Sequence, residues 1–157
     1  MEREIVTRTA SIVALVASAL LVGDLFLDWQ RVRVEVAGVA DVESTSMGWS
    51  GWGFSVGLLA LLIVVVALAQ LRGTRTLAGH ALTAGVLALG LLAATFLAVF
   101  SGDASVDVAG VVGVEVQSTL WPAWAGLVLG VIASVAALVP VVAELGQPSP
   151  RGLPGPA

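Results

Sequence analysis

The chain has 157 residues, of which 58% are hydrophobic and 11% are charged, and its formal net charge is −4. Because an ordinary soluble domain is about 25% charged, this composition excludes a soluble globular protein, and its hydrophobicity excludes a disordered chain. A nucleic-acid binder would need a basic surface, so that class is excluded too. The mean hydropathy of +1.02 indicates an integral membrane protein.

Most residue types that carry catalytic or metal chemistry are missing. The sequence contains no cysteine and no lysine, and its one histidine is His80. Thiol chemistry, thiolate metal sites and Schiff bases are therefore excluded, and one histidine cannot form a histidine-based metal cluster. No nucleophile–base pair or phosphate-binding loop is found. We expect a protein that is not an enzyme and that holds no cofactor and no metal.

Four apolar stretches are long enough to cross a bilayer, which takes about 20 residues. In chain order they cover residues 10–27, interrupted by Asp24, then 53–71, 82–100 and 121–143. Residues 17–19 resemble a signal-peptide cleavage site, but the apolar run continues beyond them, so a span is expected. The stretches predict an all-α transmembrane four-helix bundle.

The arginines predict the orientation of this bundle, because positive residues are enriched in cytoplasmic segments. Five arginines flank the expected cytoplasmic ends of the spans or lie in the tail, namely Arg3, Arg8, Arg72, Arg75 and Arg151, and two lie in the first long loop, Arg31 and Arg33. Both termini are therefore expected in the cytoplasm, with the long loops 28–52 and 101–120 outside. These loops hold two basic and seven acidic residues, so the outer face is acidic.

We expect a single membrane domain over residues 1–145, built from two similar units at 9–72 and 81–144. The remaining segment, 146–157, holds four of the six prolines and is predicted to be a disordered cytoplasmic tail.

The two units are recognised by their outer loops. Residues 34–56 align with 106–128 without a gap, and 11 of the 23 positions are identical. The identities include a Trp-x-x-Trp pair in register, at Trp49/Trp52 and Trp121/Trp124. Because each unit has an even number of spans, an axis along the membrane normal should relate them.

Each outer loop predicts a β-hairpin. Charged residues alternate with valines over 31–37, and valines alternate in the second loop, which is typical of half-buried strands. Turns are expected at Gly38, Asp41, Gly110 and Gly113. The expected strand pairs are 31–37 with 42–47 and 104–109 with 113–118. Together they would form a four-stranded antiparallel extracytoplasmic sheet, with its valine face over the helix ends, its charged face in solvent, and free edges open to strand addition.

All nine aromatic residues are expected near the outer interface: Trp29, Trp49, Trp52, Trp121, Trp124, Phe26, Phe54, Phe96 and Phe100. They could form an aromatic belt, since tryptophan prefers the headgroup level. However, belts normally form at both interfaces, and the inner one is missing here. The alternative is a contact surface for a partner protein or a lipid.

Asp24 is the ionisable residue that interrupts a span, and intramembrane carboxylates often serve in proton or cation paths. It lies three residues from the expected span end, so it could instead reach interfacial water or pair with Arg31 or Arg33. Asp28 follows one turn later on the same helix face. Both remain candidates for ion coupling. Elsewhere, Gln70 near the inner end of the second span is expected to extend toward the interface, and no dense oxygen cage for a metal is present.

The segments LFLDW (25–29) and GWSGW (48–52), followed by a Gly/Leu/Ala-rich span, resemble small four-span actinobacterial membrane proteins of unknown function. Many of these have proline where this chain has Asp28. The resemblance implies a bacterial plasma membrane and no particular activity. The layout is also similar to that of claudins, but their first loop carries a cysteine pair that this chain lacks, so only the architecture is comparable.

Three functions are compatible with these features. The first is a non-enzymatic interaction protein, an accessory subunit or scaffold that binds another membrane protein or its own copies through the outer sheet and tryptophans. The second is a small proton or cation transporter or channel component that uses Asp24. The third is a lipid or quinone site beneath the outer sheet. Small residues at four-residue spacing, as at Gly126 and Gly130, favour close helix packing within the bundle or between copies.

Overall fold

The fold comes from a computed structural model that describes residues 2–36, 42–72, 77–100, 105–108, 112–117 and 120–145, with backbone alone over most strand positions. Four helices form the body: α1 (Glu2–Asp24), α2 (Trp52–Leu71), α3 (Leu77–Phe100) and α4 (Trp121–Leu145). Each contains a stretch long and apolar enough to cross a membrane, which confirms four helices of spanning length. The first ends at Asp24 and not at residue 27, so Asp24 ends the helix and does not interrupt it. The expected tail, 146–157, lies outside the described residues.

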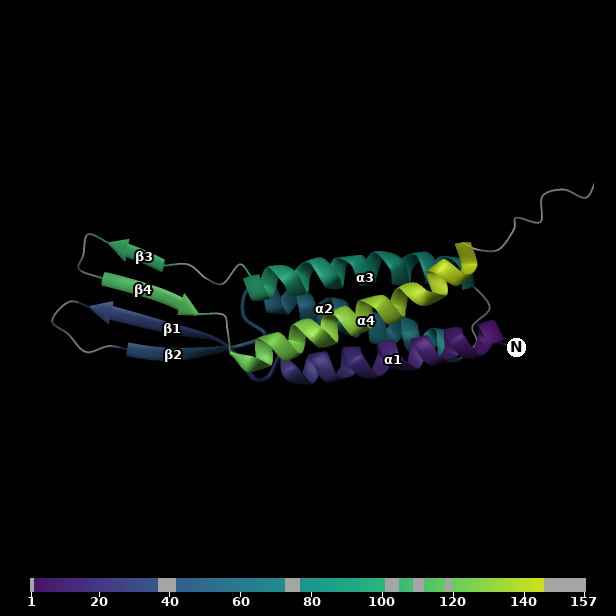
Figure 1. Ribbon diagram of the computed structural model, residues 1–157, viewed down its shortest axis with the longest axis horizontal. Helices are drawn as coiled ribbons and strands as arrows, with labels where there is room; N and C mark the ends of the chain where they lie inside the picture. The colour runs from purple at the N-terminus through teal and green to yellow at the C-terminus, as the bar shows by residue number, and fades with distance from the viewer. Residues whose placement is uncertain are drawn as a thin grey trace, which may run out of the picture.

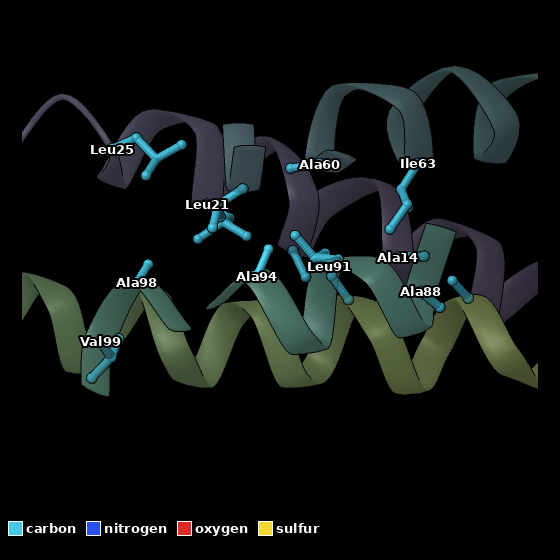
Figure 2. Close-up of a cluster of buried hydrophobic side chains, with 14 of the residues drawn as sticks. Ala14, Leu21, Leu25, Ala60, Ile63, Ala88, Leu91, Ala94, Ala98 and Val99 are labelled. Carbon is cyan, nitrogen blue, oxygen red and sulfur yellow. The ribbon is translucent and has the colours of Figure 1, made fainter. Parts of the chain in front are cut away.

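The helices form a ring in which α1 packs against α2 and α4, and α3 packs against the same two neighbours. Small side chains line the centre of this ring. Ala14, Ala60, Ala88 and Ala94 are buried there among a few larger residues such as Leu21, Leu25, Ile63 and Leu91 (Figure 2). Alanine at these positions lets neighbouring helices approach closely, which is how helices associate in lipid.

Polar side chains also join the helices. The Ser11 hydroxyl of α1 donates to Gln70 Oε1 of α2 over 2.9 Å. Gln70 thus bonds to a neighbouring helix, which the sequence-based expectation for this residue did not include. On α3, the buried Thr95 hydroxyl donates to the Leu91 carbonyl over 2.7 Å, so its hydrogen-bonding need is met within its own helix.

Four strands form one antiparallel sheet in the order β2-β1-β4-β3. They are β1 (Asp28–Val36), β2 (Val42–Met47), β3 (Ser105–Val108) and β4 (Val112–Gln117). The two hairpins, β1–β2 and β3–β4, confirm the expected strand pairs, although Gly113 lies within β4 rather than in a turn. The other expected turn residues, Gly38, Asp41 and Gly110, lie outside the described residues.

The sheet extends away from one end of the bundle, opposite the N-terminus, and its strands run along the same long axis as the helices (Figure 1). Among the described elements, the helices reach the sheet only at β1, which contacts α4 and is hydrogen-bonded through Trp29 to the end of α1. The expectation that the valine face covers the helix ends is therefore wrong. The physical reason is that β1 continues along the direction of the bundle instead of folding across it.

The two hairpins pair in the same register. Val34 is opposite Val42 in the first, and Val106 is opposite Val114 in the second, a constant offset of 72 residues. The helix ring would permit a twofold axis that exchanges α1 with α3 and α2 with α4. Such an axis would convert β2-β1-β4-β3 into a different order, so it does not hold for the sheet.

The strand directions explain this departure. Because β1 and β3 run in the same direction, a symmetric junction between hairpins would pair two parallel strands. The observed junction pairs β1 with β4, with Val34 opposite Val114, and keeps every neighbour antiparallel. The hairpins are therefore related by a shift of two strands along the sheet.

Candidate interaction surface

A bulge at the start of β1 connects the sheet to the bundle. The register of β1 against β2 shifts between Asp28 and Gln30, and bulges of this kind re-aim the local side chain. Trp29 lies at this shift and is only 3% exposed. Its indole Nε1 donates to the carbonyl oxygen and to the carboxylate Oδ2 of Asp24, each over 3.1 Å. These bonds connect the last residue of α1 to the start of β1.

Trp29 fits against α4 because that helix has no side chain at residue 126. A Cβ on Gly126 would overlap the Trp29 ring at Cζ2 and lie 2.8 Å from Asp24 Oδ2. Any larger residue would push the indole out of place. The small residues of α4 therefore serve packing within this chain at this point.

Trp49 also packs over a glycine. A Cβ on Gly57 of α2 would overlap the Trp49 ring at Cζ3, and the half-buried indole packs against the hydrophobic core. The ring of Phe26 meets it edge-on, with 5.6 Å between ring centroids. The turn that carries Trp49 depends on Gly51, which has a φ of +54° that suits glycine.

The remaining seven aromatic residues are exposed at the end of the bundle from which the sheet projects: Phe26, Trp52, Phe54, Phe96, Phe100, Trp121 and Trp124. On α3, Phe96 and Phe100 stack with their centroids 5.6 Å apart. Trp124 of α4 meets Phe100 edge-on at 5.9 Å. The nine aromatic residues therefore divide into two anchors, Trp29 and Trp49, and seven surface residues.

The burial of Trp29 contradicts its expected role as a contact residue. Because its side chain is buried and hydrogen-bonded, it has no surface to offer a partner or a lipid, so the expected contact role does not fit it. One feature of the sequence could have indicated this burial, namely the carboxylate of Asp24 five residues earlier, which can accept a hydrogen bond from an indole N–H. The opposing glycine lies almost a hundred residues away and could not be assigned from the sequence.

Asp24 is 8% exposed at the end of α1 and accepts the bond from Trp29. It does not pair with Arg31, which instead forms a 2.9 Å ion pair with Glu43 on the surface of the sheet. Asp28 is exposed, so the two candidate ion-coupling carboxylates occupy different environments. Within the described residues, no group of three potential metal ligands comes together.

An apolar groove of about 530 Å³ lies between α1 and α4. It is lined by residues such as Ile5, Val13, Val131 and Val135, which belong to the half of the bundle away from the sheet (Figure 1). This groove is therefore not the lipid or quinone site expected beneath the sheet.

Comparison with known proteins returns no match, whether against protein-family models, curated proteins or solved structures.

Proposed function

We propose that this chain is a non-enzymatic interaction protein of a bacterial plasma membrane, an accessory subunit or scaffold. It binds another membrane protein or its own copies through an extracytoplasmic sheet and the exposed aromatic residues at the base of that sheet. The two hairpins belong to repeated units, and the arginine distribution puts the sheet outside and both termini in the cytoplasm.

The observation that carries this proposal is the projecting sheet. Among the described elements, β2, β3 and β4 contact no helix, although a sheet with an apolar face normally packs against a second layer. Exposed aromatic residues, including Trp121 and Trp124, surround its base. Tryptophan and phenylalanine are enriched in the buried centres of protein interfaces, so these side chains suit a binding role.

The test is to purify the tagged protein from its native membrane in mild detergent and to identify associated chains by native mass spectrometry. The variant replaces Trp52, Trp121 and Trp124 together with alanine. A matched control replaces Leu61, Leu68 and Leu89 with alanine, since these residues are also exposed but lie within the spans. We expect the tryptophan variant to lose its associated chain by at least about tenfold, which is about 1.4 kcal/mol, and the leucine control to retain it.

An unchanged association in the tryptophan variant would remove the aromatic surface from the proposal. If neither a partner nor a second copy accompanies the protein under any of these conditions, the interaction function itself is wrong.

A further inference from the structure

The register of the sheet separates its residues into two chemically different faces. On one face, β1 contributes Arg31 and Arg33 and its neighbours contribute Glu43 and Glu115, so that Arg33 is opposite an acidic residue on both sides. The other face is aliphatic over most of its length. Its nine valine positions, called the valine face below, are Val32, Val34, Val36, Val42, Val106, Val108, Val112, Val114 and Val116.

Strands β2, β3 and β4, which carry six of the nine valine positions, contact no described helix. The described helices reach the sheet only at β1, through its contact with α4 and the bond of Trp29 to the end of α1, and the sheet projects beyond the bundle (Figure 1). Ser44 shares this face through its pairing with Val32 and is exposed. A single antiparallel layer with an apolar face requires a second layer for stability, and the described helices do not supply it.

We infer that the second layer is the valine face of a second copy of this chain, so that two sheets stack into a β-sandwich above the membrane. This inference rests on the proposed interaction function and names its partner. Copies in one bilayer have parallel bundle axes, and the strands run along that axis (Figure 1). A twofold axis along the membrane normal therefore brings two identical faces together with their strands aligned, as in aligned β-sandwiches.

The chemistry and the area both agree with a second copy. The valine positions carry no charge, so stacking two of these faces requires no desolvation of an ionised group. Burying a valine side chain removes at least about 60 Å² from water, given about 1.5 kcal/mol at about 25 cal/mol per Å². Nine valines from each copy then bury roughly 1,100 Å², which clears the threshold of about 1,000 Å² for a specific interface.

Edge pairing is the competing arrangement. The free edges, β2 and β3, run in opposite directions, so β3 of one copy would pair antiparallel with β2 of the next. This contact is heterologous and leads to rings or chains rather than to a closed pair. It would also leave the valine face open to water, so face stacking buries more apolar surface than edge pairing does.

The absence of cysteine allows a sharp crosslinking test in the full-length chain. Val34→Cys places a thiol on an inner strand of the valine face, and Arg33→Cys places one on the opposite face of the same strand. Native membranes are treated with a bis-maleimide that spans about 10 Å, the usual spacing of stacked sheets. We expect at least tenfold more crosslinked dimer from Val34→Cys than from Arg33→Cys.

A charge substitution gives an independent measurement. Val34→Asp should abolish the dimer in native mass spectrometry, while the control Thr45→Asp, on the charged face, should retain it. Equal crosslinking of both cysteine variants would overturn the inference. So would preferential crosslinking between Thr45→Cys and Asp107→Cys, which would identify edge pairing.

The outcomes also separate this inference from the proposed function. If the native protein is a monomer joined to a different protein that the triple tryptophan variant loses, the second-copy inference fails and the interaction function stands. If it is a monomer that carries only lipid, both fail.

Discussion

Trp49 and Trp121 occupy equivalent positions in the two aligned segments, yet they differ in burial. Trp49 packs over Gly57 against the core, whereas Trp121 is 73% exposed. The same offset of 72 residues relates Gly57 to Leu129, so the second half has no glycine at the corresponding position. Similar sequences therefore lead to an anchor in one half of the molecule and a surface residue in the other, and the glycine that leaves room for the indole is present only beside the anchor.

The largest expected change in stability comes from removing the indole of Trp49, and the same change at Trp121 provides the comparison. Trp49→Ala should lower the free energy of unfolding by about 3 kcal/mol, since buried tryptophan truncations cost about 3–5 kcal/mol and this side chain is half-buried. Trp121→Ala should change it by no more than about 0.5 kcal/mol, as expected for an exposed residue. Reversible unfolding in mixed detergent micelles measures both. Equal losses would show that the two tryptophans are anchored alike.

A smaller effect is expected from filling the space beneath Trp49. Gly57→Ala should cost about 1–3 kcal/mol, because the added Cβ overlaps the indole and overpacking has this typical cost. Gly23→Ala is the matched control, since a Cβ there meets nothing within 4 Å, and it should stabilise the protein by up to about 1 kcal/mol through helix propensity. The same unfolding assay applies, and a neutral Gly57→Ala would refute the close fit.

The smallest change in stability is expected at Asp24, for which the sequence left ion coupling open as one alternative. Asp24→Asn keeps an oxygen that can accept from Trp29 Nε1, and the Asp24 carbonyl accepts from the same group. We expect a change in stability below about 1 kcal/mol, within the range of a neutral hydrogen bond, and unchanged proton flux in liposomes. A loss of flux in this variant would instead favour the transporter function and assign Asp24 a role beyond the Trp29 anchor.

Local patterns made much of the architecture accessible from the sequence. The four helices follow from apolar length, because a bilayer requires about 20 such residues. The hairpins follow from the alternation of valine with charged residues, since successive strand residues point to opposite faces. These signals depend on neighbouring residues alone, so they survive without knowledge of the fold.

The burial of individual aromatic residues was not accessible in the same way. Trp29 and Trp121 are both tryptophans near a span end, and locally only the carboxylate of Asp24, five residues before Trp29, distinguishes them. Trp29 is buried because the bulge in β1 turns it toward Asp24 and because Gly126 leaves room on a distant helix. The interaction surface predicted from the sequence was therefore too large by at least this one residue.

The sequence by itself determined four membrane-length helices, two hairpins and a division of strand residues into valine and charged positions. Each of these features follows from a local pattern of apolar and charged residues. Only the tertiary structure decided that the sheet projects along the bundle axis, that β1 joins β4, and that two of the nine aromatic residues are anchors. Those features depend on strand direction and on the space between segments far apart in the chain. Such long-range fits leave no periodic trace in the sequence.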